Sequence, residues 1–510
     1  MHRRSAVSED EDPLTLAIAP PPNETPAERE HRLFEERKAK EISDRIDEEI
    51  NAQRLAEKKE NPVRVLLLGQ SESGKTTTLK NFQLINSPKA FKAERASWRA
   101  VIQLNVARSI RIIIDAMSRA QQASSSAPSS PVTPSSLDDV SIPEAENEQL
   151  PTLTAEHLKL KMRLSPLLQV EESLWRRLSP STAVQIETSH LSSITNVPLP
   201  TRPKEVYVQS TMPWKSTFSR LMSTSSRDSS ESDTGIDFDD PKDPGVILNN
   251  CAEDMIKLWH DPTIRELLSA LRIRLEDTPG FFLDDLERIT ASRYVPSDDD
   301  ILKARLKTMG VSEHRFVLKT GNLVSRDWRV FDVGGARSLR AAWAPFFELI
   351  NAIIFLAPLS CFDQSLIEDP SVNRLEDSIL LWRSIVSNHL LRSVELILFL
   401  NKCDILKAKL ESGVQFSKWV ISYGDRPNTF DGTSKYMKKK FGTILRNNSP
   451  MPRTFYCHFT SVTDIQSTFQ ILENVKDFIV RRNLAVSHML IFSCLILTGA
   501  FCWTLVRNVA

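Results

Sequence analysis

The chain has 510 residues, which allows two to four domains. Its 65 lysines and arginines balance 65 aspartates and glutamates, so the class of strongly basic nucleic-acid binders is excluded, and no nucleic-acid partner is expected. The six cysteines form no CxxC pair and none lies in the first 250 residues, which is typical of a reduced intracellular protein and not of a disulfide framework.

The N-terminal region divides into a polar arm and a charged helix. Residues 1–26 are polar and contain proline, so we expect a disordered arm. Residues 27–60 contain neither proline nor glycine, which predicts a long exposed helix with one thin apolar stripe formed by Ile42, Ile46 and Ile50. Either this helix is solvated and binds nothing, or the stripe binds a partner, because so narrow a stripe cannot hold the helix against the rest of the chain.

The middle of the chain, residues 86–295, alternates helical patterns with low-complexity stretches. Helical periodicity is found at 95–120, 152–178 and 246–290. Two stretches are rich in Ser with Pro or Asp and cannot bury enough apolar area to offset their ordering entropy, so we expect disorder at 121–150 and 223–243.

Short apolar runs suited to buried strands lie on both sides of this region. Val63–Leu68 is one, and four later runs alternate with helical stretches, at Trp328–Phe331, Ala352–Leu356, Leu396–Leu400 and Phe455–His458. This alternation predicts an α/β fold with a parallel sheet. Residues 86–295 then form an insertion within an α/β domain.

A phosphate-binding motif follows the first strand. Gly69–Thr76 fits GxxxxGK[ST] between a strand and a helix. Its backbone amides would surround phosphate oxygens at a helix N-terminus, Lys75 would reach the terminal phosphates, and the Thr76 hydroxyl would ligate Mg²⁺. The alternative is a glycine-containing turn.

Three further motifs each follow a predicted strand. Asp332–Gly335 (DVGG) offers a carboxylate for Mg²⁺ and a close backbone approach to a γ-phosphate. Asn401–Asp404 (NKCD) is typical of a guanine reader, since a carboxylate accepts from N1–H and from the 2-amino group that adenine lacks. Thr460–Thr463 offers a backbone amide to the guanine O6. Chance explains each motif alone, but it explains four in this order at strand ends poorly.

These motifs resemble those of heterotrimeric G-protein α subunits. The likeness covers about 61–120 and 246–484 and is most specific over Tyr294–Gly310, which is similar to the family's first switch segment. It implies an α/β fold, a Ras-like P-loop GTPase domain with an inserted all-α helical domain, that binds GTP or GDP with Mg²⁺. The corresponding division is a disordered arm at 1–26, an N-terminal helix at 27–60, the Ras-like domain at 61–85 and 296–484, the helical domain at 86–295 with disordered segments at 121–150 and 223–243, and a hydrophobic C-terminal segment at 485–510.

The resemblance also assigns roles to residues. Catalysis would use Lys75, Arg305 as an arginine finger in cis, and position 336, where this chain has Ala336. The metal would be held by Thr76, Thr308 and, through water, Asp332. The residues expected to contact GTP are Glu72, Ser73, Gly74, Lys75, Thr76, Thr77, Arg305, Thr308, Asp332, Gly335, Asn401, Lys402, Asp404 and Val462.

A second switch segment would run from Asp332 through Trp343, and with the N-terminal helix it would bind the G-protein βγ dimer. Trp343 could equally be an ordinary core aromatic. A downstream effector is implied but cannot be identified. The family's receptor-reading C-terminal residues are not recognisable, which puts receptor coupling in doubt.

Several positions depart from the family pattern. Ala336 replaces the glutamine that orients the attacking water, and Ser71 replaces a glycine beside the γ-phosphate. Both changes predict slow hydrolysis, unless another group such as Arg337 or Glu72 positions the water. Met309 replaces a threonine on the surface read by GTPase-accelerating partners, which puts their action in doubt.

The expected mode of membrane attachment also differs. Position 2 is His2, not the glycine of a myristoylation signal, and no cysteine precedes Cys251 for palmitoylation. Leu484–Val506 has no charged side chain and as a helix would span roughly 33 Å, enough for a bilayer core. We expect a tail anchor at the cytoplasmic face of a membrane; the alternatives are a buried or partner-covered helix, or an incorrect end of the sequence.

Together these features predict a guanine-nucleotide-binding, signal-transducing switch with slow GTP hydrolysis. The alternative is a GTP-bound scaffold that barely hydrolyses and acts as an interaction protein. A P-loop ATPase is a distant third interpretation, because the NKCD motif favours guanine.

Overall fold

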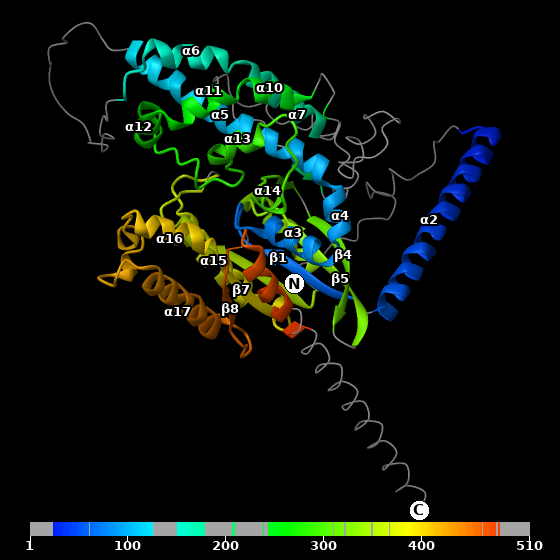
Figure 1. Cartoon of the computed structure of the whole chain (residues 1–510). Coiled ribbons are helices and arrows are strands. Elements are labelled where there is room, and N and C mark those ends of the chain that lie inside the picture. Colours follow the sequence, from blue (N-terminus) through cyan, green and yellow to red (C-terminus); the bar gives the residue numbers. More distant parts are fainter. Residues whose placement is uncertain are drawn as a thin grey trace, which may run out of the picture. The chain divides into compact units, whose positions relative to one another are not determined.

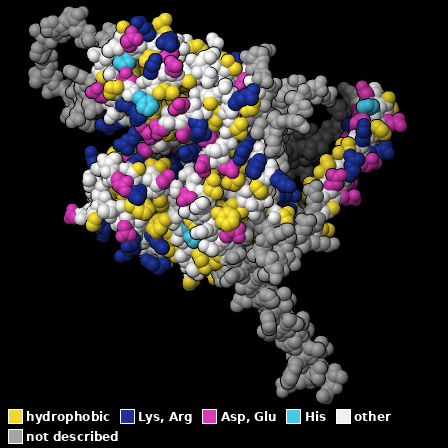
Figure 2. Space-filling model, in the orientation of Figure 1, with side chains coloured by type: hydrophobic (Ala, Val, Ile, Leu, Met, Phe, Trp, Pro, Cys, Tyr) yellow, Lys and Arg dark blue, Asp and Glu magenta, His cyan; other side chains and the backbone are white. Residues whose placement is uncertain are grey.

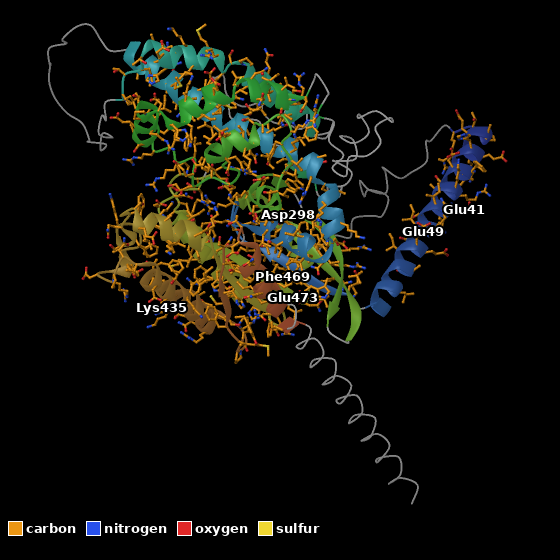
Figure 3. The ribbon with its side chains drawn as sticks, in the orientation of Figure 1. Glu41, Glu49, Asp298, Lys435, Phe469 and Glu473 are labelled. Atoms are coloured by element: carbon orange, nitrogen blue, oxygen red, sulfur yellow. The ribbon has the colours of Figure 1, made fainter. Side chains whose placement is uncertain are left out.

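The computed structural model describes residues 24–60, 62–125, 150–178, 207–209, 238, 243–309, 311–320, 323–347, 350–366, 368–461, 463–475 and 478–479. The first element, α2 (Pro26–Glu60), forms a compact unit separate from the rest of the chain. Its side chains are mostly exposed, including Ile42, Ile46 and Ile50. Acidic, basic and apolar groups mix along its surface, with Glu41 and Glu49 projecting from it (Figures 2 and 3).

A six-stranded sheet organises the second unit in the described part of the chain (Figure 1). The strand order is β4-β5-β1-β6-β7-β8, and every neighbouring pair is parallel except β4 with β5. The strands are β1 (Val63–Leu68), β4 (Val311–Thr320), β5 (Leu323–Val333), β6 (Ala352–Pro358), β7 (Glu395–Asn401) and β8 (Tyr456–Phe459).

Helices cover both faces of this sheet because the central strands are apolar on both sides. Along β1, Leu66 and Leu68 join one core with α15 (Arg374–Ser387), α16 (Cys403–Glu411) and α17 (Phe430–Asn448). Val65 and Leu67 join the opposite core with α3 (Lys75–Asn86) and the helix at 465–475. The loops at the ends of these strands therefore lie between the two layers of helices that cover the sheet.

A separate helical bundle has its own core. It contains α4 (Pro88–Ala93), α5 (Arg95–Ser125), α6 (Ala155–Arg163), α7 (Pro166–Leu178), α10 (Pro244–Asn250), α11 (Ala252–His260), α12 (Pro262–Ala270), α13 (Leu286–Ile289) and α14 (Asp298–Lys303). Its core is built around α5, with Trp98 and Trp259 among the fully buried side chains. The predicted fold class, an α/β sheet domain with an inserted helical region, is confirmed.

The remaining elements are short. Two three-residue strands, β2 (Tyr207–Gln209) and β3 (Lys307–Met309), pair with each other in parallel. The 3-10 helices are η2 (Leu283–Asp285), η3 (Arg337–Phe346), η4 (Leu359–Cys361), η5 (His389–Leu391), η6 (Phe416–Lys418) and η7 (Ile421–Tyr423).

The five strands predicted from apolar runs pair in parallel, but the sequence pattern missed a sixth strand at one edge of the sheet. β4 is antiparallel to β5, with Phe316 opposite Trp328. Its exposed and buried residues alternate, and Ser312 and His314 are among those turned inward. Because polar residues occupy both faces, this edge strand lacked the apolar run that reveals the central strands.

Two segments that were expected to be disordered are ordered at one end, so their expected bounds were wrong there. Helix α5 continues through residues 121–125, since the first helix-breaking proline is Pro128. Asp243 is ordered: it caps α10 through Gly245 N and forms a buried ion pair with Arg99, 144 positions earlier. The rest of the segments expected at 121–150 and 223–243, apart from Leu150 and Phe238, lies outside the described residues.

In the described part of the chain, no helix is both long enough and apolar enough to cross a membrane. The predicted anchor Leu484–Val506, most of the expected arm at 1–26 and Val462 lie outside that part.

Candidate nucleotide-binding site

The loop after β1 has a backbone that only glycine accepts at two positions. Gly69 and Gly74 have φ of +147° and +102°, in the region where L side chains are strained. A Cβ on Gly69 would lie 2.5 Å from the Leu356 carbonyl oxygen and 2.6 Å from Ser73 Oγ. The loop is thus folded tightly against β6 and leads into α3, whose N-terminal amides favour an anion.

Lys75 is buried at the start of α3. Its Nζ donates to the carbonyl oxygens of Gly69 at 2.9 Å and Gln70 at 2.8 Å. Burial lowers the pKa of Lys75 to about 8, although the carboxylate of Asp332 opposes this shift. An ammonium group folded onto loop carbonyls can exchange them for phosphate oxygens, which are stronger acceptors for a cation.

Thr76 and Asp332 meet although they are 256 positions apart. Thr76 Oγ1 donates to Asp332 Oδ2 at 2.8 Å. The contact arises because β1 and β5 are parallel neighbours with Leu67 opposite Asp332, so the loops that follow them start at the same edge. A hydroxyl and a buried carboxylate are the hard oxygen donors that Mg²⁺ prefers, so these residues fit that ion.

The DVGG motif packs directly on the phosphate loop. A Cβ on Gly335 would lie 2.5 Å from Ser71 N and would also meet the backbone of Gln70. No other residue fits at Gly335 without moving the loop. Ser71 therefore lies next to the point where the second motif approaches the phosphate loop.

Arg305 is held at the phosphate loop by an ion pair and by its backbone. Its guanidinium lies 2.8 Å from Glu72, which also pairs with Arg374 at 3.2 Å. Burial would raise the pKa of Glu72, but the charges of Arg305 and Arg374 outweigh it and the pKa is lowered. Asn105 of α5 accepts from Arg305 N at 2.8 Å and donates to Arg305 O at 3.2 Å.

The NKCD motif is tied to two other loops. Asn401 Nδ2 donates to Ser73 O at 2.7 Å, and Asn401 Oδ1 accepts from Thr460 Oγ1 at 3.0 Å. Lys402 has a left-handed backbone, and burial lowers its pKa. Asp404 lies exposed in the first turn of α16. The loops after β1, β7 and β8 thus meet through one buried asparagine.

The structure places the remaining expected residues as follows. Gly74 directly precedes Lys75, and Thr77, two positions after Lys75, donates through Oγ1 to Leu302 O at 3.5 Å. The backbone of Thr308 lies in β3, and its side chain is outside the described part of the structure. The contacts above bring together Ser73, Thr76, Asp332 and Asn401, whereas Asp404 stands apart from them in the described hydrogen bonds.

Ala336 is the cap residue directly before η3, and its backbone oxygen accepts from Leu339 N at 3.0 Å. Of the two groups considered as alternative water-positioning residues, Arg337 pairs with Asp369 at 3.1 Å and Glu72 with the arginines above. Trp343 is buried in a sheet core and donates to Gly334 O at 3.1 Å. Trp343 therefore contributes to the hydrophobic core beside the sheet.

Sequence reasoning missed residues that position the loop from a distance. Gln70 Nε2 donates to Arg374 O at 2.8 Å and to Ser378 Oγ at 2.7 Å, and Arg374 donates to Ser71 O at 2.8 Å. Asn105, which belongs to the helical bundle, similarly positions the backbone of Arg305. No local pattern could have revealed these contacts, because each joins segments about 200 or more positions apart.

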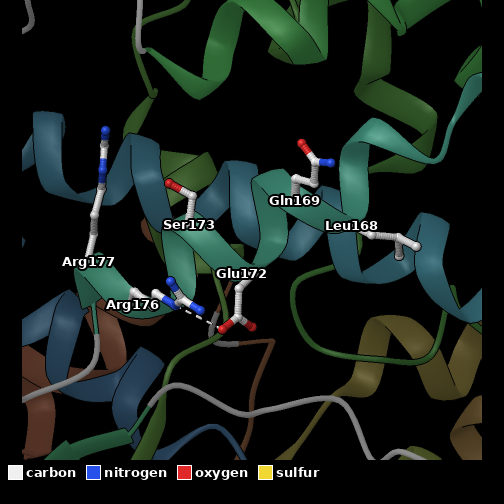
Figure 4. Close-up of a pocket in the computed structure, with 6 residues that line it drawn as sticks. All are labelled: Leu168, Gln169, Glu172, Ser173, Arg176 and Arg177. Atoms are coloured by element: carbon white, nitrogen blue, oxygen red, sulfur yellow. Dashed lines mark hydrogen bonds and ion pairs between the residues drawn. The ribbon is translucent and has the colours of Figure 1, made fainter.

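A hollow of about 500 Å³ on the surface of α7 shares no residue with this site (Figure 4). It is lined by Leu168, Gln169, Glu172, Ser173, Arg176 and Arg177.

The chain is similar to known proteins over most of its length. Residues 40–479 match the family model described as G-protein alpha subunit. The guanine nucleotide-binding protein alpha-4 subunit of Mycosarcoma maydis is 32% identical, over 93% of this chain and 95% of that protein. The alpha-2 subunit of Neurospora crassa is 29% identical over 86% and 93%, and the alpha-1 subunit of Mycosarcoma maydis 27% over 87% and 94%.

Members of this family bind GTP and GDP, are GTPases in general, and work with βγ subunits and effectors. The family match spans most of the chain, including both the sheet and the helical bundle. The chain therefore belongs to the G-protein α-subunit family and is a guanine-nucleotide-binding signal transducer.

Proposed function

We propose that this chain is a GTP/GDP switch whose own hydrolysis of GTP is slow. The observation that carries the proposal is the set of contacts around one loop: Thr76 with Asp332, Glu72 with Arg305, and Ser73 with Asn401. Three separate motifs therefore reach the loop whose glycines and buried lysine suit phosphates.

We assign the nucleotide contacts to the residues expected from the sequence. Lys75 and the loop amides, from Glu72 to Thr77, would hold the phosphates, and Gly335 would bring its amide to the γ-phosphate. Asn401, Lys402, Asp404 and the amide of Val462 would select guanine. A Mg²⁺ ion held by Thr76, Thr308 and, through water, Asp332 would neutralise charge on the β- and γ-phosphates.

Arg305 has a position suited to catalysis. Its guanidinium lies at the phosphate loop, paired with Glu72 at 2.8 Å, and Asn105 fixes its backbone. From there it could turn toward charge that develops on a transferring phosphoryl group. Ala336 cannot orient a water molecule, and both Arg337 and Glu72 are already engaged in ion pairs. We therefore expect the chemical step to be slow.

The proposed partners are those that bind the corresponding segments in other members of the family. We propose that α2 and the segment Asp332–Trp343 bind a βγ dimer, with an effector that the structure does not identify. We further propose the domain division expected from the sequence, with α5 continued to Ser125 and Asp243 joined to α10, and attachment to the cytoplasmic face of a membrane through Leu484–Val506. Receptor coupling is not part of the proposal.

The direct test loads the full chain with labelled GTP and Mg²⁺ and follows bound GTP and GDP in a single turnover over hours. A switch with slow hydrolysis binds GTP in preference to ATP and forms GDP slowly. GTP that stays intact throughout supports the alternative, a GTP-bound scaffold. GDP formed within minutes contradicts the inference from Ala336, and displacement of GTP by excess ATP contradicts guanine selectivity.

Base selection has a test of its own in Asp404→Ala. The substitution removes a charged acceptor for two guanine donors, so GTP affinity should fall by about two orders of magnitude while ATP affinity stays low. Asp425→Ala, which removes an exposed carboxylate elsewhere, is the matched control and should bind as the parent does. Equal affinity of the Asp404→Ala protein and the parent would remove Asp404 from the base site.

A further inference from the structure

The structure pairs a strand from the helical insertion with the first switch segment. β2 (Tyr207–Gln209) lies in the chain between α7 and α10, and β3 (Lys307–Met309) lies just after Arg305. The two strands are parallel, with Tyr207 opposite Lys307, Val208 opposite Thr308 and Gln209 opposite Met309. This pairing connects the insertion with the residue assigned to the metal.

β3 lies beyond the end of the main sheet. The β4–β5 ladder reaches Val311 opposite Val333, and β3 directly precedes β4. The backbone at 307–309 is therefore extended past its neighbour β5. An extended backbone that overruns its neighbour presents an edge to which another strand can add, and in this structure β2 adds there.

The sequence of β2 suits this role. Tyr207 and Val208 are aromatic and β-branched residues, respectively, whereas the surrounding sequence is rich in Ser, Thr and Pro. A three-residue strand would bind too weakly as a separate peptide. Because β2 is connected to the same chain, its effective concentration at β3 is high, and a short ladder can form.

We propose that β2 is a positioning strand that holds the first switch segment extended at Thr308 and slows its release. The inference rests on the proposed function, since Thr308 is assigned to Mg²⁺ there. Arg305 would then be fixed from two sides, by Asn105 before β3 and by the β2 ladder after it. In a simple switch this segment leaves when the γ-phosphate is lost; here the ladder must open first.

The test compares Val208→Pro with Val208→Thr in the full chain. Proline removes a backbone N–H and does not fit a paired strand, whereas threonine keeps the β-branched shape and the backbone groups. Hydrogen exchange is measured for the amides at 306–309, together with the dissociation of fluorescent GDP in the presence of Mg²⁺. We expect Val208→Pro to speed exchange at these amides at least tenfold and GDP dissociation severalfold, and Val208→Thr to match the parent.

A second variant, with residues 207–209 replaced by Gly-Ser-Gly, covers the case in which Val208 N–H does not take part in the ladder. Parent-like exchange at 306–309 in both variants would overturn the pairing. Faster exchange with unchanged GDP dissociation would overturn the restraint on the switch. Unchanged exchange at the β1 amides shows that the variants are folded.

The two proposals fail in different ways. A parent protein that binds no guanine nucleotide contradicts the proposed function. The exchange experiment on the nucleotide-free chain still decides whether β2 protects 306–309.

Discussion

At the scale of single residues, we expect the binding groups of the site to be intact and one catalytic position, Ala336, to be altered. Thr76, Asp332 and Asn401 make the hydrogen bonds that join the motifs. Ala336 is half-buried and directly precedes η3. We therefore expect a change at Ala336 to alter turnover more than nucleotide binding.

The first prediction concerns Ala336→Gln. A glutamine amide can orient the attacking water and support charge in the transition state, so single-turnover hydrolysis should rise at least about tenfold, which corresponds to about 1.4 kcal/mol. Ala336→Leu adds similar bulk without the amide and should not accelerate hydrolysis. If Ala336→Gln hydrolyses GTP as slowly as the parent, the limitation lies elsewhere, and Ser71→Gly becomes the next variant.

The second prediction concerns His314, which is buried in β4 near Ser312 at 3.3 Å. Burial lowers its pKa to about 4, against about 6.5 in an unfolded chain. The unfolded chain therefore takes up a proton between pH 6.5 and 4 while the folded chain does not. Stability should fall as pH falls through this window, by up to about 3 kcal/mol.

His314→Gln removes this titration, so its melting temperature should depend less on pH between 6.5 and 4 than that of the parent. His260→Gln, which changes an exposed histidine in the helical bundle, is the control and should follow the parent curve. Parallel curves for the parent and His314→Gln would show that His314 titrates normally.

At the scale of elements, a buried ion pair joins parts of the helical bundle that low-complexity sequence separates along the chain. Arg99 of α5 and Asp243 lie 2.7 Å apart with nearly buried side chains, and Asp243 also caps α10. The chain between α7 and α10 thus returns to a fixed point on α5.

The third prediction is that Asp243→Ala destabilises the protein by about 3–5 kcal/mol, because it leaves Arg99 buried without its counter-charge and removes a helix cap. Thermal unfolding of the nucleotide-free chain measures the effect. Glu253→Ala changes an exposed carboxylate of the neighbouring α11 and should shift the melting temperature little. A similar small shift for both variants would contradict the inferred weight of the Arg99–Asp243 pair.

At the scale of the whole second unit, charged contacts join the helical bundle to the sheet domain beside the nucleotide site. Lys409 of α16 is buried between Asp277, at 2.6 Å, and Asp363, at 2.8 Å. Arg274 pairs with the same Asp363 at 2.5 Å. Arg305 and Asn105 make a second connection between the two parts. We propose that the bound nucleotide lies between these connections and leaves only when they loosen.

The fourth prediction is that Asp277→Ala speeds GDP release by about tenfold, since it removes one of the two carboxylates that Lys409 joins. Dissociation of labelled GDP into excess unlabelled nucleotide measures the rate. Glu276→Ala alters the exposed neighbouring residue and should leave the rate unchanged. Equal rates for the parent and Asp277→Ala would show that this contact does not limit release.

The sequence by itself determined the features that depend on local pattern. The central strands are recognisable because buried strands must be apolar on both faces, and α2 because its charged stretch lacks helix breakers. The GxxxxGK[ST] loop and the NKCD motif are recognisable because each chemistry needs fixed residue types at fixed spacing. The fold class followed from these patterns, and the family from the motifs together with the stretch Tyr294–Gly310; both are confirmed.

Only the tertiary structure decided what joins distant segments. The antiparallel β4, the ion pair of Arg99 with Asp243, and the contacts of Gln70 with α15 connect residues that no local period relates. The pairing of β2 with β3 also could not be predicted from the sequence. Strands pair through backbone groups that are the same in almost every residue, so the sequence does not specify the partner strand. Local sequence sets which segments can be helix, strand or phosphate loop, and packing of the folded chain sets which of them meet.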